Sequence, residues 1–401
     1  MEPEIIETPA VELDSRIEQL QAALAKKGVD AALIVQKTDF YYFSGTAQQG
    51  WLFVPVEGKP LLMIFKEFER ARLESRLEQV VSLLSPKKIP ALLEQYGYRL
   101  PKRLGMELDV LPTALYFQYR QIFADTKIED VSLEIRMIRA IKSEHELNII
   151  RSAAALSDKV AARVPELLEA GKTEVALAGE VEAYARSLGH QGIVRMRLFG
   201  SELFYGHIMA GAAAAVPSYL ASPTGGRGVS GLVSQGAGFT KISANEPVLV
   251  DYVFAYNGYI SDHTRVFSLG TVADELLRAH EAMLEIQEAI SSLAVPGLAT
   301  GELYEQMVSL AEAKGLGENF MGAGERKIRF TGHGVGLELD EFPFIAKGQK
   351  LALEENMVIA LEPKAIFPGQ GVVGIENTHL VTPSGLVRLT NFPDEIQTLD
   401  Y

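Results

Sequence analysis

Two aspartates near the middle of the chain are spaced so that their carboxylates can meet on one face of a β-hairpin. Asp251 and Asp262 lie in β-rich runs on either side of an Asn-Gly pair at residues 257–258, the strongest short-range hairpin signal because both residues accept the positive φ of a type I′ turn. With that turn, Val253 faces Asp262, and Asp251 lies on the same face, roughly 7–8 Å away across the strands. Two like charges on an apolar face repel each other and lose solvation, so the pattern predicts a cation between them. The alternative is that one aspartate pairs with Arg265 and the other is solvated.

Three more candidate ligands lie downstream, each on or beside a strand-like stretch. His333 stands among glycines, Glu362 follows an apolar strand expected at 357–361, and Glu376 lies in a strand expected at 372–377. A lone buried histidine is more often a core residue than a ligand, so the interpretation depends on the whole set. Four carboxylates and one imidazole suit Mn²⁺, Co²⁺, Fe²⁺ or Zn²⁺. Because four carboxylates balance the charge of two divalent ions, the sequence favours a two-metal site.

Helix signals divide the chain into two parts that would position these residues. A Ser/Glu capping box at 15–18 predicts the start of a first helix, which Gly28 is expected to end. A second capping box at 143–146 predicts the start of a long helix, and we place the domain boundary just before it, near Arg139. Strands and helices alternate before this boundary, which is typical of a small α/β domain.

The part after the boundary mixes longer helices with strand-like stretches and is expected to be α+β. A segment rich in Gly, Ala, Ser and Pro at 210–231 predicts a long loop over a site.

Composition narrows the possible partners and setting. The net charge of −14 disfavours binding to nucleic acid or to an anionic membrane surface. The absence of cysteine excludes disulfides, thiol nucleophiles and Cys-ligated metals. We find no secretion signal and no apolar run long enough to span a membrane, so we expect the protein to be cytoplasmic.

The ligand set resembles that of the metallopeptidase family that contains Xaa-Pro aminopeptidase, prolidase and methionine aminopeptidase. The family's five metal ligands map onto Asp251, Asp262, His333, Glu362 and Glu376. Residues 138–151 are similar to the family's interdomain signature, and residues 1–138 resemble its creatinase-type N-terminal domain. The resemblance implies an α/β N-terminal domain at 1–138 and an α+β catalytic domain with the pita-bread fold at 139–401.

This resemblance also implies a chemistry. In the family pattern, Asp251 would chelate one ion while Asp262 and Glu376 bridge both ions, and His333 and Glu362 would complete the second ion's ligands. A bridging hydroxide would attack a peptide carbonyl, with Glu362 as the catalytic proton shuttle. The implied function is that of an Xaa-Pro dipeptidase or aminopeptidase, acting on small peptides as a homodimer.

The sequence departs from the family pattern at three positions. Asp340 and Ser218 stand where typical peptidase members carry histidines, and Gly374 stands where an arginine is common. The missing imidazoles would normally bind the scissile carbonyl and the ends of the substrate, and each such contact is typically worth 10²–10³ in rate. The alternative function is therefore a non-peptide small-molecule hydrolase or lyase on the same scaffold. A third possibility, a binding protein that lost catalysis, is disfavoured because unused buried carboxylates are costly.

Other residues are candidates for replacing the missing groups. His207, which precedes the long loop, is the candidate catalytic imidazole, against the alternative of a core or surface histidine. His263 follows a ligand on the opposite strand face and is expected to be structural. Tyr219, Arg227 and Lys241 are candidates for binding an anionic substrate group, although such loop residues are usually solvated.

Overall fold

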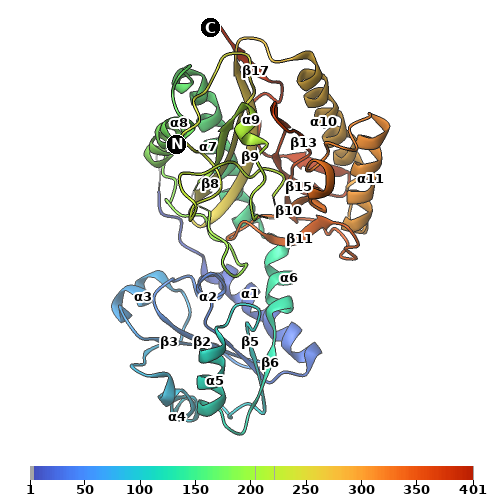
Figure 1. Cartoon of the computed structure of the whole chain (residues 1–401). Helices are drawn as coiled ribbons and strands as arrows, with labels where there is room; N and C mark the ends of the chain where they lie inside the picture. Colours follow the sequence, from blue (N-terminus) through green and yellow to red (C-terminus); the bar gives the residue numbers. More distant parts are fainter. Residues whose placement is uncertain (1–3, 204, 221, 401) are drawn as a thin grey trace. The chain divides into compact units, whose positions relative to one another are not determined.

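The computed structural model describes residues 4–203, 205–220 and 222–400 of the chain. The chain forms two compact units, Glu4–Arg139 and a second that begins at Ala140, and each contains its own sheets and helices (Figure 1). No helix in these ranges is both long enough and apolar enough to cross a membrane.

The N-terminal unit is built on one six-stranded sheet in the order β4-β3-β2-β1-β5-β6. Its strands are β1 (Ala31–Ile34), β2 (Gly50–Pro55), β3 (Leu61–Ile64), β4 (Val80–Ser82), β5 (Arg103–Met106) and β6 (Lys127–Asp130). Its helices are α1 (Ala10–Lys27), α2 (Lys37–Ser44), α3 (Phe68–Glu74), the 3₁₀ turn η1 (Pro86–Lys88), α4 (Ile89–Gln95), α5 (Thr113–Ile122) and α6 (Ser132–Ala140). Parallel and antiparallel pairs occur in the same sheet, and the predicted α/β class is confirmed.

The two predicted capping boxes have different outcomes. Helix α1 begins at Ala10 after Pro9, which makes no side-chain cap, so the predicted start at Ser15 is wrong. The buried face of α1 includes Leu13, which precedes Ser15, so the helix must begin before Ser15. Proline has a fixed φ and can stand next to the first helical turn without a capping hydroxyl. By contrast, Ser143 and Glu146 form the predicted reciprocal box at the start of α7.

The C-terminal unit contains three sheets, with strand orders β17-β9-β8-β7, β11-β10-β12-β15-β16 and β13-β14. The strands of the first sheet are β7 (Gly206–Ala210), β8 (Val248–Tyr256), β9 (Tyr259–Leu269) and β17 (Gln397–Leu399). Those of the second are β10 (Phe330–Gly334), β11 (Glu341–Ala346), β12 (Val358–Leu361), β15 (Asn377–Thr382) and β16 (Gly385–Arg388). The short pair is β13 (Lys364–Phe367) and β14 (Gly371–Gly374).

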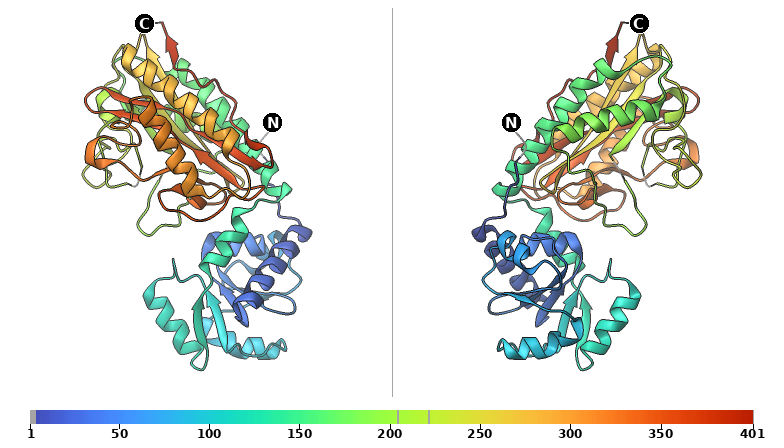
Figure 2. Two further views of the ribbon diagram at one scale, coloured as in Figure 1. Left: turned by 90° about the vertical axis from the view of Figure 1, so that its right-hand side faces the viewer. Right: turned by 90° about the vertical axis from the view of Figure 1, so that its left-hand side faces the viewer.

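Helices cover these sheets from opposite sides, as the two views in Figure 2 show. Helix α7 packs on β8 and β9, whereas α10 packs on β13, β14 and β16, and α11 on β10 and β11. The helices are α7 (Glu144–Leu167), α8 (Glu174–Ser187), α9 (Gly211–Ala214), α10 (Asp274–Leu293), α11 (Thr300–Ala313) and the 3₁₀ turn η2 (Gly324–Arg326). This layered arrangement confirms the α+β class predicted for this part of the chain.

The strands that carry the candidate ligands follow the predicted hairpin register but differ in one boundary. Val253 pairs with Asp262 across β8 and β9, and the loop residues Asn257 and Gly258 have φ of 46° and 90°. The single strand expected at 372–377 is instead two strands, because β14 ends at Gly374 and β15 begins at Asn377. Between these two strands, Glu376 forms an isolated antiparallel β-bridge with Thr264 of β9.

Candidate metal centre

The sheets of the C-terminal unit bring all five predicted ligands to the wall of one cavity of about 460 Å³. Asp251 comes from β8 and Asp262 from β9. His333 lies on β10, Glu362 directly follows β12, and Glu376 lies between β14 and β15. Side chains from segments far apart in the sequence thus converge on one concave region, which makes it the candidate functional site.

Three of these side chains form a set that fits one divalent ion. One ligand atom each from Asp262, His333 and Glu376 lies within 4.8 Å of the other two, and all three residues are buried. The Nε2 atom of His333 is 3.7 Å from Oδ2 of Asp262 and 3.9 Å from Oε1 of Glu376. These separations exceed hydrogen-bond lengths. They match the spacing of ligands around one ion, since bonds of about 2.1 Å place two ligand atoms roughly 3–4 Å apart.

Neighbouring polar groups hold the two carboxylates of this set in place. Thr264 donates its hydroxyl to Oε2 of Glu376 at 2.9 Å, and the backbone N–H of His263 donates to Oδ1 of Asp262 at 2.9 Å. Backbone hydrogen bonds also join Thr264 and Glu376.

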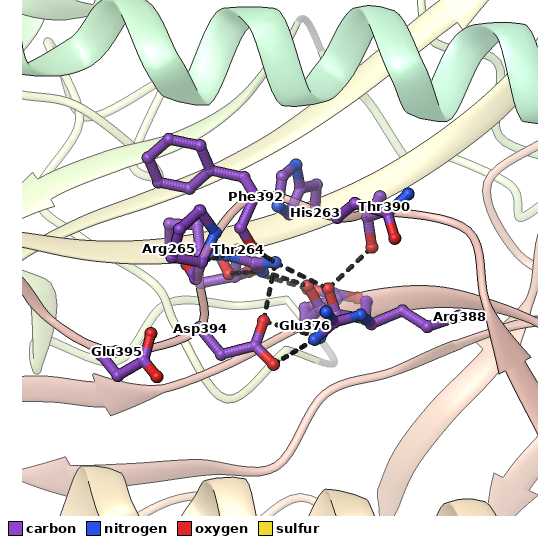
Figure 3. Close-up of polar contacts among 12 residues, drawn as sticks. His263, Thr264, Arg265, Glu376, Arg388, Thr390, Phe392, Asp394 and Glu395 are labelled. Carbon is purple, nitrogen blue, oxygen red and sulfur yellow. Dashed lines mark hydrogen bonds and ion pairs between the residues drawn. The ribbon is translucent and has the colours of Figure 1, made fainter.

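Arg265 is directed away from the two hairpin aspartates. Its guanidinium donates to the backbone oxygen of Glu376 at 3.1 Å and forms an ion pair with Asp394 at 2.8 Å (Figure 3). The alternative in which Arg265 neutralises one of the hairpin aspartates therefore does not hold. Arg265 instead holds the backbone of the candidate ligand Glu376 in place.

Lys364, which the sequence analysis did not single out, lies in the middle of the carboxylates. Its Nζ atom is 3.0 Å from Oδ2 of Asp251 and 2.9 Å from Oε2 of Glu362. The same atom is 2.9 Å from Oε2 of Glu376. Lys364 follows Glu362 by two residues, across the short connection between β12 and β13, and both side chains turn to the same site. That spacing is the signal by which it could have been found.

Gly374 makes room for this lysine. It pairs with Lys364 across β13 and β14 and has a φ of 142°. A Cβ atom at this position would lie 2.4 Å from the oxygen of Pro363 and 2.6 Å from Cα of Lys364. The family pattern commonly has an arginine here. This chain has a glycine instead and brings its cation from the opposite strand.

Burial and repulsion by neighbouring carboxylates shift the pKa values of Asp262 and Glu376 upward. Burial, followed by the charges of Glu376 and Asp251, raises the pKa of Asp262 well above its usual range. Burial raises the pKa of Glu376 to about 7, although Lys364 acts in the opposite direction. The pKa of Lys364 is raised well above its ordinary value, because the surrounding carboxylates outweigh the lowering effect of burial. The raised pKa values show that ionisation of Asp262 and Glu376 is disfavoured despite Lys364, and a further cation would stabilise their ionised forms.

The residues fit one divalent ion and do not fit the expected second one in this arrangement. An ion held between Asp251 and Glu376 would lie close to the position of the Lys364 ammonium. At an effective dielectric of 20, a divalent ion about 4 Å from an ammonium is repelled by roughly 8 kcal/mol. The charge balance that favoured two ions also changes, because Lys364 already supplies one positive charge.

His207 reaches the cavity, as expected of the candidate imidazole. It pairs with Asp251 in the β7–β8 register. Its Nδ1 lies 3.2 Å from the hydroxyl of Thr224, and its Nε2 lies 3.1 Å from the side-chain oxygen of Gln235. Burial lowers the pKa of His207 despite the opposing charge of Asp251. The ring is therefore a neutral, firmly held hydrogen-bonding group.

The two positions that lack the usual histidines differ from each other. Asp340 lines the cavity. Ser218 is not among the described residues that line it, and its hydroxyl donates to the backbone oxygen of Ser234 at 2.7 Å. His263 contacts the hydroxyl of Ser157 on α7 at 3.0 Å, which agrees with its expected structural role.

Among the described residues, the rest of the cavity wall is mainly apolar and includes one exposed cation. None of Tyr219, Arg227 and Lys241 is among the described residues that line it, whereas Arg329, which the sequence analysis did not consider, is. The apolar lining residues include Met196, Leu198, Leu203, Leu220, Val253, Phe330, Leu339, Phe344 and Ala346. The cavity thus combines an ion-binding set, a carboxylate cluster and an apolar surface that suits a small organic substrate.

Comparisons with known proteins cover nearly the whole chain. The model of "Metallopeptidase family M24" matches residues 148–383, and that of "Creatinase/Prolidase N-terminal domain" matches residues 16–141. The Xaa-Pro dipeptidase of Pyrococcus furiosus is 29% identical over 390 residues, which cover 96% of this chain and 100% of that protein.

Solved structures of similar fold are also prolidases and dipeptidases. The prolidase from Pyrococcus horikoshii OT3 has a TM-score of 0.79 at 27% identity, with 94% of this chain and 99% of that one covered. The Xaa-Pro dipeptidase from Bacillus anthracis has a TM-score of 0.82 at 24% identity, covers 96% of this chain and 100% of that one, and shows the likeness of fold.

Proposed function

Because the chain belongs to metallopeptidase family M24 and carries a creatinase/prolidase N-terminal domain, we propose that it is a metal-dependent peptidase that hydrolyses short Xaa-Pro peptides. The observation that carries this proposal is the ion-fitting set of Asp262, His333 and Glu376 in the wall of a largely apolar cavity. The curated relative with 29% identity is an Xaa-Pro dipeptidase, which favours peptide chemistry over the non-peptide alternative.

The donor set supports binding of Mn²⁺, Co²⁺, Fe²⁺ or Zn²⁺, because it mixes carboxylate oxygens with an imidazole nitrogen. Asp262, His333 and Glu376 would hold the ion. When bound, such an ion supplies Lewis acidity toward a carbonyl oxygen and lowers the pKa of water.

Glu362 is the proposed proton carrier. It lines the cavity, and one of its carboxylate oxygens accepts a hydrogen bond from Lys364 at 2.9 Å. This contact fixes the orientation of the carboxylate beside the ion-binding set. From there Glu362 would take a proton from the attacking water and pass it to the leaving nitrogen.

The remaining cavity residues would orient the substrate. The apolar wall, including Phe330 and Phe344, suits the pyrrolidine ring of a proline and excludes water from the scissile bond. The exposed guanidinium of Arg329 suits the free carboxylate of a dipeptide. His207 is the proposed imidazole in place of a missing family histidine. Its N–H now faces the side-chain oxygen of Gln235 and would exchange that contact for one to the substrate.

The proposal is tested with protein stripped of metal and then reconstituted with Mn²⁺ or Co²⁺. We expect hydrolysis of Xaa-Pro dipeptides, no comparable hydrolysis of matched dipeptides with alanine in place of proline, and loss of activity with a chelator. Absence of cleavage of every Xaa-Pro dipeptide and tripeptide by ion-loaded protein would contradict the proposal. Turnover of a non-peptide compound alone would favour the alternative hydrolase or lyase.

Two further expectations remain proposals of the same kind. We propose a cytoplasmic setting because the chain contains no cysteine. We propose a homodimer because of the family resemblance. Light scattering on purified protein measures the second directly, and a monomeric mass would contradict it.

A further inference from the structure

We propose that the ammonium of Lys364 takes the place of a second metal ion, so that the centre binds one divalent ion per chain. The inference rests on the proposed function only in taking this site to bind a divalent ion. It replaces the two-ion expectation with a centre in which one cation is a side chain of the protein.

The contacts of Lys364 are those of a specifically bound cation. Its three nearest oxygen partners belong to Asp251, Glu362 and Glu376, at 2.9–3.0 Å. An ammonium group has three N–H donors, so three carboxylate acceptors satisfy it completely. The residue is also fully buried. A buried cation with all its donors paired to carboxylates is strongly held in place.

The backbone around Lys364 is built to direct the side chain inward. Its N–H lies 3.4 Å from the sulfur of Met321, and its carbonyl accepts from the backbone N–H of Met321 at 2.9 Å. Gly374 lies opposite Lys364 in the β13–β14 pair. A side chain at position 374 would collide with the backbone of Pro363 and Lys364, and glycine avoids this collision. Contacts with Met321 and pairing with β14 therefore hold the backbone of Lys364 in place.

The carboxylates fall into two sets, one around the ammonium of Lys364 and one that would hold the metal ion, and Glu376 belongs to both. Asp251 and Glu362 contact the ammonium, and neither belongs to the three-residue set whose ligand atoms lie within 4.8 Å of one another. Glu376 contributes one oxygen to each side, because Oε2 contacts Lys364 while Oε1 is the atom near His333. One oxygen of this carboxylate thus remains for an ion after the ammonium is satisfied.

The half that remains for an ion is sufficient for a catalytic centre. Asp262, His333 and Glu376 supply three protein ligands, and single-ion hydrolytic sites typically use three such ligands and keep a further position for water or substrate. The cavity adjoining this set provides space for that further position. A second ion is therefore not needed to account for a hydrolytic site.

The test compares metal stoichiometry in the full chain and in two lysine variants. Wild type, Lys364→Met and Lys350→Met are stripped, loaded with excess Mn²⁺ or Co²⁺, and freed of unbound metal by gel filtration before elemental analysis. Lys350 is an exposed lysine in the same part of the chain and serves as the matched control. We expect one ion per chain in wild type and in Lys350→Met. We expect two ions in Lys364→Met, because the freed carboxylates of Asp251 and Glu362 then accept a metal.

Each outcome has a definite meaning. Two tightly bound ions in wild type would overturn the inference and leave the proposed function intact. A single ion in folded Lys364→Met would also overturn it, because the lysine would then not be what excludes the second ion. If Lys364→Met does not fold, as judged by circular dichroism, the wild-type stoichiometry alone decides. Absence of any bound ion in wild type would instead contradict the proposed function.

Discussion

The carboxylate cluster has two halves that are chemically alike and differ in where their positive charge comes from. In one half, Asp251 and Glu362 surround the ammonium of Lys364, which is attached to the chain. In the other half, Asp262 and His333 have no such cation among the described residues, and their ligand atoms are spaced for an ion. Strands can therefore bring carboxylates together either around a cation of the protein itself, such as a lysine ammonium, or around a metal ion bound from solution. What distinguishes the halves is a single residue on β13.

The comparison is tested most strongly by removing one aspartate from each half. Asp262→Asn should weaken ion binding by roughly 10³-fold, because replacing one charged ligand in a buried site costs about 4 kcal/mol. Asp251→Asn, the matched control, should retain one ion with little change in affinity, because Asp251 contacts the ammonium. Titration calorimetry with Mn²⁺ measures both affinities.

Equal losses in the two aspartate variants would contradict the division into halves. A large loss in Asp251→Asn alone would show that the ion lies on the side that we assign to Lys364.

Glu362 belongs to the ammonium half by contact but is proposed to act on substrate. Glu362→Gln should lower kcat by about 10²–10³-fold, because the amide cannot carry the proton. The bound ion should remain, since this residue lies outside the ion-fitting set. Steady-state kinetics with parallel elemental analysis checks both, with the exposed Glu354→Gln as control. Loss of the ion together with activity would instead make Glu362 a metal ligand.

Removing the internal cation should make the stability of the protein depend on external metal. In metal-free protein, Lys364→Met leaves the buried carboxylates of Glu362 and Glu376 and the half-buried one of Asp251 without their partner. The expected loss is about 3–5 kcal/mol. A divalent ion should restore most of this loss, because it binds the same carboxylates. The midpoint of urea unfolding, measured with chelator and with Mn²⁺, gives the two values.

The exposed Lys350→Met should show neither effect, since the residue does not lie among these carboxylates. If added metal stabilises Lys364→Met no more than wild type, the ammonium and a metal ion do not substitute for each other.

The smallest expected effect lies outside both halves, at Arg329. Arg329→Met should raise KM for an Xaa-Pro dipeptide by about tenfold, the equivalent of one hydrogen bond to a charged group. The increase should be absent for the same dipeptide with an amidated C-terminus, which lacks the carboxylate. A similar increase for both substrates would assign Arg329 a general role in shaping the cavity.

The sequence predicts the local parts of this fold better than their boundaries. The β8–β9 register follows from Asn257 and Gly258, because a type I′ turn determines which residues face each other. The predicted start of α1 at Ser15 is wrong because the apolar pattern continues before this residue. Burial of Leu13 favours a helix that begins earlier, even though Ser15 could cap a later start. The break between β14 and β15 accompanies the β-bridge of Glu376 with Thr264 of β9. Such a contact between distant segments cannot be read from the local sequence pattern.

The candidate site was predictable where side chains lie on regular strands. Alternation places Asp251 and Asp262 on one face, and the family resemblance connects them with the distant ligands. Lys364 was missed because lysine side chains are usually solvated, so its spacing from Glu362 was not read as a sign of a buried cation. Arg329 was missed because it lies outside any regular strand, where sequence periodicity gives no direction.

The central claim is that one cation of this centre is Lys364 and the other is a single divalent ion. Anomalous diffraction from crystals of the wild-type protein grown with Mn²⁺ tests it most directly. The account predicts one anomalous peak per chain, within bonding distance of Asp262, His333 and Glu376, with the lysine ammonium still among its three carboxylates. Two peaks bridged by Asp262 and Glu376, with Lys364 displaced from the cluster, would contradict it.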